Sequence, residues 1–222
     1  MALTDLHELL RTLRVWSPGT TELRPFDPDT APPTPLSLFT SWFAEAVDAG
    51  QPEPHTMTLA TTDEDGDPDA RIVVMHGADA EGWSFGTHST SRKGRALSAH
   101  PYAALVFYWP VLGRQVRLRG PVSAAPSHDS QADLQARSTG ALAAALTGRQ
   151  SEDLDSLEEL RNASEAAWDR ARRNPTEPSP TWTLYRVRPE TVEFFQGDSE
   201  RRHVRLEYRK TGWGWQRQLL WP

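Results

Sequence analysis

The chain has 222 residues, of which 37% are hydrophobic, and a formal net charge of -6. That length suits one globular domain, and the acidic balance argues against a nucleic-acid binder or an anionic-membrane binder, so any anion site must be local. The absence of cysteine excludes disulfides, thiolate catalysis and cysteine-ligated zinc. Asp5, Glu8 and Arg11 interrupt the N-terminus, so it lacks the apolar core of a signal peptide, and no run is long enough to span a membrane; a cytoplasmic protein is expected.

The first part of the chain is predicted to form a helix, an arm and a second helix. Leucines at helical spacing predict a short amphipathic helix over 3–14, and the proline-rich stretch 17–35 predicts an extended arm. A second helix is predicted over 36–48. We therefore divide the chain into an N-terminal helix and proline-rich arm, residues 1–35, and a domain, residues 36–222.

Alternation of apolar and polar residues begins near His55 and predicts strands. The run over 70–77 is expected to be a buried strand, because it contains consecutive apolar residues. The other predicted strands are separated by turns and by a short helix within 91–100, and they cover 56–62, 83–88, 102–109 and 114–125.

Helical patterns return after residue 126. Helices are predicted over 127–147 and 151–173, the second with Ser151 as its N-cap and with an apolar stripe of Leu154, Leu157, Leu160, Ala163, Ala167 and Ala171. Two further strands, 182–195 and 203–222, are predicted to return the chain to the sheet. The number of strands favours a barrel, because closure removes exposed sheet edges. The predicted fold class is α+β, an antiparallel β-barrel with flanking helices.

A group of cations and hydroxyls lies where two predicted strands end and a helix begins. It consists of Arg71, Thr87, Ser91, Arg92 and Lys93. Backbone amides at the helix N-terminus and fixed side-chain donors can converge there on one phosphate. The alternative is a solvated basic loop, which is common at helix starts.

A second group, Arg201, His203 and Arg205, alternates along a segment that is predicted to be extended. Alternation places all three side chains on one face, which is costly unless an anion is bound there. Ion pairs with Glu200 or Glu193 would also explain the pattern.

Three further polar residues each have two interpretations. Gln150 and Ser151 lie at a predicted helix start and offer polar groups to a ligand, although a helix cap would account for Ser151. Gln115 is either a ligand contact or part of the exposed face of a strand. The sequence has no glycine-rich phosphate loop, dinucleotide fingerprint, nucleophile elbow or histidine pair with metal-ligand spacing, so no metal is expected.

Seven short segments occur in order along the chain: "RIVV", "FGTHSTSRKGR", "FYW", "RQV", "GRQS", "EFFQG" and "RRHVR". In this order they resemble the pyridoxamine 5'-phosphate oxidase family of FMN-binding split barrels, over roughly residues 36–222. The resemblance implies an FMN-dependent oxidase that passes electrons to O2 and releases hydrogen peroxide. It also implies a homodimer in which FMN lies in the cleft between subunits and both chains line each site.

The resemblance further implies which residues contact FMN. Thr87, Arg92 and Lys93 would hold the phosphate and ribityl chain, which need cationic donors. Phe195 stands where the vitamin enzymes of the family usually have a tryptophan, so apolar contact is kept and an indole donor is lost. The full expected set is Arg71, Ile72, Val73, Val74, Gly86, Thr87, Ser91, Arg92, Lys93, Gln115, Gln150, Ser151, Phe195 and Arg205.

On the substrate side the chain departs from the vitamin enzymes. Those enzymes grip the vitamin phosphate with a lysine, a tyrosine, an arginine and a serine, and the corresponding residues here are His76, Asp133, Arg137 and Ala141. An aspartate beside a phosphate dianion is repulsive, and the lysine and both hydroxyls are lost. Arg201 and His203 match the family's C-terminal arginine and histidine. They are the expected catalytic residues, which orient the substrate together with His76 and Arg137, and His203 is a candidate proton acceptor.

The segments "FGTHSTSRKGR", "FYW", "GRQSEDL" and "LRNA" resemble the phenazine-biosynthesis branch of the family more closely. FMN oxidases of that branch aromatise partly reduced phenazine carboxylic acids. Such flat, carboxylate-bearing substrates suit arginine and histidine anchors between aromatic walls. We therefore expect an oxidase of this type. The alternatives are a pyridoxamine or pyridoxine 5'-phosphate oxidase and a flavin-binding module without turnover.

Overall fold

The computed structural model describes residues 5–13, 15–16 and 23–222, which form two compact units. The first unit takes the described residues up to 54 together with 108–116 and 193–222, and the second takes 55–107 and 117–192. Among the described residues, no helix is both long and apolar enough to cross a membrane.

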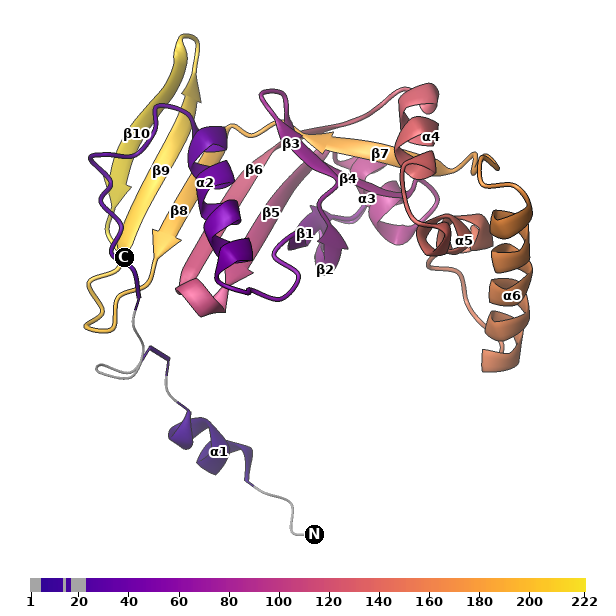
Figure 1. The fold of residues 1–222 in the computed structure, drawn as a ribbon, viewed down its shortest axis with the longest axis horizontal. Helices are drawn as coiled ribbons and strands as arrows, with labels where there is room; N and C mark the ends of the chain where they lie inside the picture. Colours follow the sequence, from indigo (N-terminus) through magenta and orange to yellow (C-terminus); the bar gives the residue numbers. More distant parts are fainter. Residues whose placement is uncertain (1–4, 14, 17–22) are drawn as a thin grey trace. The chain divides into compact units, whose positions relative to one another are not determined.

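The first unit contains antiparallel strands in the order β10-β9-β8-β6-β5, of which the last three contribute only the parts that belong to this unit. Strands β9 (Val204–Thr211) and β10 (Gly214–Leu220) form a hairpin, which lies beside β8 in Figure 1. Helix α1 (Leu6–Thr12) buries none of its residues. Helix α2 (Pro35–Asp48) begins with a proline, whose missing N–H costs nothing in the first turn, and Thr34 caps it by accepting from the amide of Ser37.

Aromatic rings and one buried cation form the core of the first unit. Trp42 of α2 packs edge-on against Phe194 with 5.2 Å between ring centroids. The Arg114 guanidinium is buried 4.3 Å above the Trp42 ring and donates to Gln196 (2.8 Å) and Glu45 (3.0 Å). Burial lowers the pKa of Arg114 and Glu45 opposes that shift. These contacts offset the cost of dehydrating the cation, and they fix the end of β8 beside Phe195.

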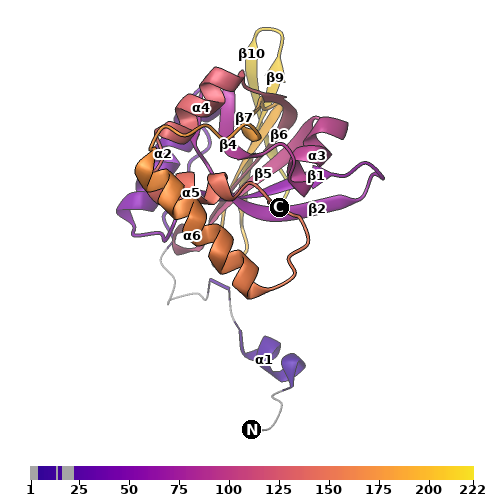
Figure 2. The same cartoon turned by 90° about the vertical axis from the view of Figure 1, so that its right-hand side faces the viewer.

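The second unit is a set of antiparallel strand pairs with four helices. Its pairs are β1 with β2, β1 with β5, β3 with β4, β4 with β7, and β6 with β7. Figure 2 shows the β1–β2 ribbon with α3 beside it.

The helices and strands from residue 56 to residue 196 have the following bounds: β1 (Thr56–Thr62), β2 (Pro68–Val74), β3 (Gly77–Asp79), β4 (Gly82–His88), α3 (Arg92–Ala99), β5 (Tyr102–Trp109), the turn η1 (Pro110–Leu112, in the first unit), β6 (Arg114–Ala124), α4 (Ser127–Gln135), α5 (Thr139–Thr147), α6 (Leu157–Arg173), β7 (Trp182–Val187) and β8 (Thr191–Gln196).

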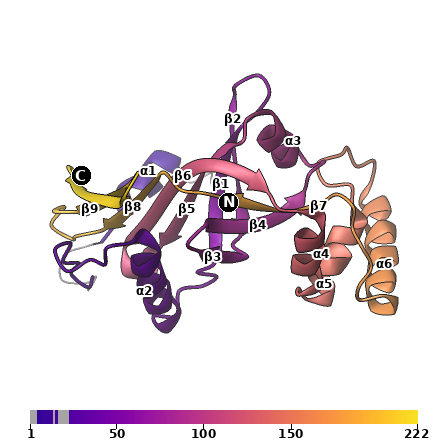
Figure 3. The same cartoon turned by 90° about the horizontal axis from the view of Figure 1, so that it is seen from above.

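Helices α4, α5 and α6 lie together at one end of β4 and β7 (Figure 3). They enclose a small apolar core with Trp182 packed against it, made of Leu134, Leu142, Ala143, Ala145, Leu146, Ala167 and Ala171. Because most of these side chains are small, the helices can approach closely. This layer therefore holds the side chains at the ends of α4 and α5 in fixed positions next to β4.

Several predicted elements are confirmed. Strands over 56–62 and 102–109 have the predicted bounds, and helix α2 begins one residue earlier than expected. Helix α1 is shorter than the predicted 3–14, of which residues 3, 4 and 14 lie outside the described residues. The mixed α+β class with antiparallel strands is confirmed as well.

The prediction of a buried strand over 70–77 is wrong. Strand β2 ends at Val74 and has no fully buried residue, and the Ile72 side chain is 66% exposed. The physical reason is position, since β2 is the last strand in the sheet order and has β1 alone as its described neighbour. Residue 77, expected at the end of that strand, instead begins the short strand β3 (Gly77–Asp79), which also takes in the first two residues of the turn expected over 78–82.

The helix boundaries after residue 126 also differ from the prediction. The expected helix 127–147 is two helices, because Ser138 starts α5 anew and accepts from the amide of Ala141. Ser151 is not a cap: its φ of 74° is left-handed, and α6 begins after Ser156, whose hydroxyl accepts from the amide of Glu159 at 3.1 Å. Of the predicted apolar stripe, Leu154 precedes α6, Leu157 and Leu160 are exposed, and Ala167 and Ala171 are buried.

Each of the two strands predicted at the C-terminus is a pair of strands. The segment 182–195 turns between β7 and β8 at residues 188–190, and the segment 203–222 turns between β9 and β10 at Gly212 and Trp213. Continuous alternation of apolar and polar residues hid both turns, since a tight turn changes the pattern by few residues.

We expect Gly86→Ala to destabilise the fold, because a Cβ at this position would lie 2.4 Å from Cζ2 of Trp182 and 2.6 Å from Cε1 of His76. Overpacking of this kind costs about 1–3 kcal/mol in the free energy of unfolding. The matched control is Gly212→Ala, which meets nothing within 4 Å and should stay within about 0.5 kcal/mol of wild type. Urea unfolding measures both variants, and equal effects would contradict the prediction.

Candidate functional site

A cavity of 430 Å³ in the second unit collects most of the predicted cations. Strand β2 and the start of α3 supply its positive groups, and the loop after α5 supplies acidic ones. Its lining residues are Asp69, Arg71, Arg92, Lys93, Ser151, Glu152 and Asp153. The structure thus brings together Arg71, Arg92, Lys93 and Ser151, which the sequence places 80 residues apart at the extremes.

Arg71 is held rigidly at the edge of this cavity. Its guanidinium donates to the carbonyl of Leu59 (3.2 Å) and the hydroxyl of Thr61 (2.8 Å) on the neighbouring strand β1. It also pairs with Asp69 at 2.5 Å on its own strand. A guanidinium fixed by three partners is pre-organised, because little side-chain entropy remains to be lost when an anion binds.

Lys93 links the cavity to Thr87 and Gln150. Its ammonium donates to the Thr87 hydroxyl (3.3 Å) and to Oε1 of Gln150 (3.2 Å), and Thr87 donates to the same oxygen at 2.9 Å. Burial lowers the pKa of Lys93, Arg71 lowers it further, and Asp69 opposes them. A phosphate dianion bound here would accept hydrogen bonds from these cationic donors, so the residues fit the phosphate end of FMN.

Two predicted hydroxyls have defined surroundings. The Ser91 side chain is buried at the start of α3, where it accepts from the amide of Gly94 (3.2 Å) and donates to the carbonyl of His88 (2.7 Å). Its hydroxyl therefore shapes the helix start that faces the cation group. Ser151 is exposed and lies on the cavity wall next to Gln150.

The apolar part of β2 exposes its side chains. Ile72 and Val74 are exposed on one face, while Arg71 and Val73 are half-buried on the other. Gly86 lies on β4, where the absence of a side chain leaves room for the rings of Trp182 and His76. Exposed apolar side chains beside a cation cavity are expected where a flat cofactor or a second chain covers them.

A buried ion cluster lies near the end of β2. Nδ1 of the His76 ring donates to the Asp133 carboxylate at 2.9 Å, and Arg137 forms a short ion pair with the same carboxylate. The side chains of His76 and Asp133 are 10% and 9% exposed. Burial raises the pKa of Asp133, but the hydrogen bonds from His76 and Arg137 outweigh it and leave the pKa below its usual value.

Ala141 lies close by, on the wall of a second cavity. This cavity has a volume of 580 Å³ and lies between α5, α6 and β4. Its lining includes Gly86, Thr87, Gln150 and Trp182. At position 141, which the resemblance aligns with a serine of the vitamin enzymes, this chain therefore contributes a methyl group to the cavity wall.

The remaining predicted residues belong to the first unit. Arg205 donates to Glu193 (2.9 Å) and to the carbonyl of Trp221 (2.7 Å), so the predicted ion pair with Glu193 is present and raises the pKa of Arg205. Phe195 lies against His203, with 5.1 Å between ring centroids. Gln115 is half-buried at the start of β6.

The prediction that Arg201, His203 and Arg205 share one strand face is wrong. Strand β9 begins at Val204, and Arg201 has a left-handed φ of 67°. A turn centred on Asp198 interrupts the extended backbone before the strand, because its carboxylate accepts from the amides of Glu200 and Arg202. Alternation alone gave no signal for this turn, although an aspartate followed by a serine is a common turn start.

Sequence reasoning missed two residues at this end of the first unit. Trp16 packs against both Phe195 (6.1 Å between centroids) and His203 (5.6 Å, edge-on). Asp198 donates its amide to Nδ1 of His203 at 3.0 Å. Among the described residues, no group of three or more histidine, aspartate or glutamate side chains is arranged to hold a metal ion.

We expect Lys93→Met to weaken FMN binding about 10- to 100-fold, because one charge-assisted hydrogen bond to the phosphate is lost. Quenching of flavin fluorescence measures the dissociation constant. Arg95→Met is the matched control: it removes one charge from the same helix, but Arg95 lies outside the cavity and donates to the carbonyl of Thr90. The control should stay within about threefold of wild type. An equal loss in both variants would show a general charge effect instead of a site.

We expect the stability that Asp133 provides to depend on pH. Its folded-state pKa is lowered, so the carboxylate stabilises the fold above its unfolded pKa of about 4, and the contribution is lost as the pH falls through the folded value. At pH 7 the free energy of unfolding of wild type should exceed that of Asp133→Asn by about 1–3 kcal/mol. This difference should shrink below about pH 4.

Urea unfolding at both pH values measures this difference. Asp169→Asn is the control, since Asp169 is exposed and its nearest cation, Arg172, is 3.5 Å away. Its effect should stay within about 0.5 kcal/mol at either pH. A difference between wild type and Asp133→Asn that does not change with pH would contradict the prediction.

Comparison with known proteins gives two family matches. A family model described as "Pyridoxamine 5'-phosphate oxidase" matches residues 43–170, and one described as "Pyridoxine 5'-phosphate oxidase C-terminal dimerisation region" matches residues 182–222. The chain is 45% identical over 178 residues to the pyridoxine/pyridoxamine 5'-phosphate oxidase of Burkholderia ambifaria, covering 80% of this chain and 83% of that protein. It is also 45% identical to the protein of the same name from Burkholderia multivorans, over 83% of this chain and 86% of that one.

A solved structure is also similar. It is PhzG from Burkholderia lata 383 in complex with tetrahydrophenazine-1-carboxylic acid. The TM-score is 0.84 at 30% identity, and the match covers 92% of this chain and 100% of that chain.

Proposed function

Because the chain belongs to the pyridoxamine 5'-phosphate oxidase family, we propose that it oxidises a planar, partly reduced ring compound that carries a carboxylate and no phosphate, of the reduced phenazine carboxylic acid type. The coarser predictions are confirmed by the family: an α+β split barrel, the cofactor FMN, and an FMN-dependent oxidase that uses O2. The substrate is the part that the proposal adds.

The ion cluster of His76, Asp133 and Arg137 carries this proposal. In the resemblance to the vitamin enzymes, these positions and Ala141 take the places of the phosphate-binding residues. Asp133 pairs with Arg137, so these two side chains together carry no net charge. A phosphate dianion would therefore find neither the lysine of the vitamin enzymes nor an arginine whose charge is not already matched.

The phosphate-binding side chains that this chain lacks increase the preference for a substrate without a phosphate. A charge-assisted hydrogen bond contributes about 1.5–3 kcal/mol, and His76 and Ala141 replace a lysine and a serine. An aromatic carboxylate carries a single negative charge, which it can place elsewhere, against Arg201. The solved structure of PhzG contains tetrahydrophenazine-1-carboxylic acid, and its likeness to this chain over 92% of the length supports the same substrate class here.

Bound FMN would supply the oxidation, in which a hydride leaves a saturated ring carbon and the electrons pass on to O2, giving hydrogen peroxide. The protein binds the cofactor and orients the substrate. We propose that Arg71, Arg92 and Lys93 hold the cofactor phosphate, assisted by Thr87, Gln150 and Ser151. The strand from Arg71 to Val74 and Gly86 would lie along the flavin, where the exposed Ile72 and Val74 exclude water.

The proposed assembly is a homodimer. Residues 182–222 match a dimerisation region, and the first unit carries Gln115, Phe195 and Arg205 together with Arg201 and His203. In the proposal these residues of one copy complete the site of the other copy. Arg201 and His203 orient the substrate, and the Phe195 ring provides an apolar wall.

A second candidate is a pyridoxine/pyridoxamine 5'-phosphate oxidase. The names and the 45% identity of the relatives favour this candidate over the phenazine type. The two candidates share the fold, the cofactor and the chemistry, and they differ in whether a phosphate group must be bound. The ion cluster is the point on which they can be separated.

We expect purified FMN-loaded protein to oxidise a reduced phenazine carboxylic acid with a kcat/KM at least about 100-fold above that for pyridoxine 5'-phosphate, which corresponds to about 2.7 kcal/mol. Oxygen uptake with each substrate measures this ratio. A ratio in favour of the vitamin phosphate would overturn the proposal. FMN binding without bleaching by either substrate would leave only a flavin-binding module.

A variant tests the physical reason. The triple variant His76→Lys, Asp133→Tyr and Ala141→Ser restores the phosphate-binding residue types of the vitamin enzymes, so its kcat/KM for pyridoxine 5'-phosphate should rise by about 10-fold or more. Ala141→Ser alone is the control and should change this value by less than about threefold, because the repulsive carboxylate remains. No gain in the triple variant would show that the cluster does not set the specificity.

A further inference from the structure

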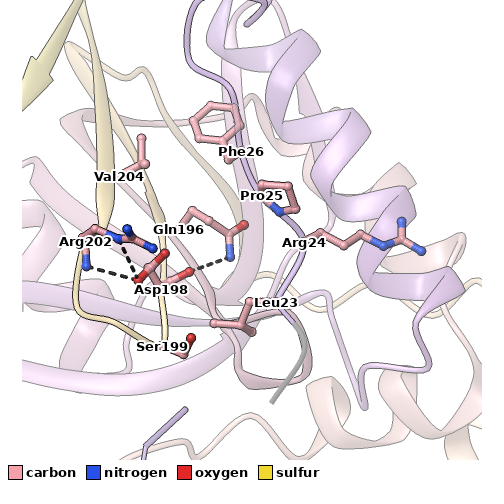
Figure 4. Close-up of a pocket in the computed structure, with 10 residues that line it drawn as sticks. Leu23, Arg24, Pro25, Phe26, Gln196, Asp198, Ser199, Arg202 and Val204 are labelled. Carbon is pink, nitrogen blue, oxygen red and sulfur yellow. Dashed lines mark hydrogen bonds and ion pairs between the residues drawn. The ribbon is translucent and has the colours of Figure 1, made fainter. Parts of the chain in front are cut away.

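The segment between β8 and β9 closes around Asp198 (Figure 4). One carboxylate oxygen of Asp198 accepts from the amides of Glu200 (2.7 Å) and Arg202 (3.3 Å). The carbonyl of Asp198 accepts from the amide of Arg201 at 3.0 Å. Three hydrogen bonds therefore converge on this one residue, and they hold Arg201 in its left-handed conformation, which is unfavourable for a residue with a side chain.

The amide of Asp198 determines the state of His203. It donates to Nδ1 of the ring at 3.0 Å. A ring nitrogen that accepts a hydrogen bond carries no proton, so the neutral ring must carry its proton on Nε2. His203 therefore presents an N–H donor on the side of the ring away from Asp198.

The ring has little freedom to turn over. Phe195 lies 5.1 Å from it in a tilted arrangement, and Trp16 lies 5.6 Å away with its ring nearly perpendicular. A flip would place a carbon opposite the Asp198 amide and leave that amide without its acceptor, which is unfavourable. The hydrogen bond and the two rings together select one orientation.

We propose that Asp198 is a positioning residue, which fixes His203 as a hydrogen-bond donor through Nε2 and turns Arg201 toward the same substrate. This inference rests on the proposed function for the identity of the substrate. It replaces the expected role of His203 as a proton acceptor: the donor binds a carboxylate oxygen or a ring nitrogen, both of which are acceptors. The substrate anchor is then a pair of donors, Arg201 and His203, presented by one turn.

The hydrogen bonds that the Asp198 carboxylate accepts, and not its ion pair with Arg202, position Arg201 and His203. The Arg202 guanidinium is 3.8 Å from Asp198 and 2.9 Å from Glu200, and its side chain is exposed. Exposed pairs of this kind contribute little. The two amide hydrogen bonds are the contacts that bend the backbone, so an uncharged acceptor at position 198 should suffice.

The first test reads the tautomer in the FMN-loaded protein without substrate. Histidine labelled with nitrogen-15 is incorporated, and the signals of His203 are assigned by their loss in His203→Gln. At a pH where the ring is neutral, the expected result is a protonated Nε2 and an unprotonated Nδ1. A proton on Nδ1, or rapid averaging between the two nitrogens, would overturn the proposal. Because no substrate is present, this outcome is independent of whether the proposed function is correct.

The second test compares two substitutions of Asp198 with whichever substrate is turned over. Asp198→Asn keeps the oxygen acceptor and should retain kcat/KM within about threefold of wild type. Asp198→Gly keeps the backbone amide but loses the acceptor, and should lower kcat/KM about 10-fold, with averaging of the His203 tautomer and unchanged FMN affinity. Equal losses in both variants, or a wild-type rate and tautomer in Asp198→Gly, would overturn the proposal.

The third test separates donor from acceptor at position 203. Gln offers an amide N–H near the place of Nε2, whereas Glu offers only acceptors. His203→Gln should therefore retain at least about 10-fold more kcat/KM than His203→Glu. The reverse order would restore the proton-acceptor role. Circular dichroism and bound FMN confirm that both variants are folded before the rates are compared.

Discussion

The carboxylate of Asp133 joins two parts of the second unit that are 57 residues apart in sequence. It binds His76 just after β2 and Arg137 just after α4, so the helical layer and the sheet meet at one buried charge. A buried carboxylate is stable only with such partners, because desolvation alone would favour its protonated form. The contact ties the residue that follows β2 to the end of α4, and in the proposed function it also influences which substrate is accepted.

Local pairing explains how an acidic chain can place several cations in one cavity. Arg71 is held by Asp69, and Glu152 and Asp153 line the same cavity. The cavity therefore contains fixed cations without a large positive field around the whole molecule. Lys93 shows this balance of charges: burial and Arg71 lower its pKa, and Asp69 opposes them. Net charge describes the surface, whereas the ligand meets only the few groups within a Debye length of it.

The sequence predicts the strands well where burial alternates, as over 56–62 and 102–109, since each residue then reports its own face. The meeting of Thr87, Lys93 and Gln150 is also predicted, through the fixed order of the family motifs. It fails where tertiary contacts decide. Ser151 and Ser156 are equally good caps by residue type, and packing of Ala167 and Ala171 selects the later start. The turn at Asp198 is missed for a different reason: Arg201, His203 and Arg205 alternate as residues on a strand would, although strand β9 begins only at Val204.

The exposed apolar residues of strand β2 matter most in a newly made chain that has not yet bound FMN. Strand β2 ends the sheet order, so within the described part of the chain one of its edges has no strand partner and lies beside exposed branched side chains. An edge of this kind is a template for further strands, and natural proteins shield such edges with charges, bulges or covering segments. Here the proposed covers are a small molecule and a second copy of the chain. The supply of flavin during synthesis would then affect the yield of soluble protein as well as its activity, because a chain without FMN would expose a sheet edge that can pair with other chains.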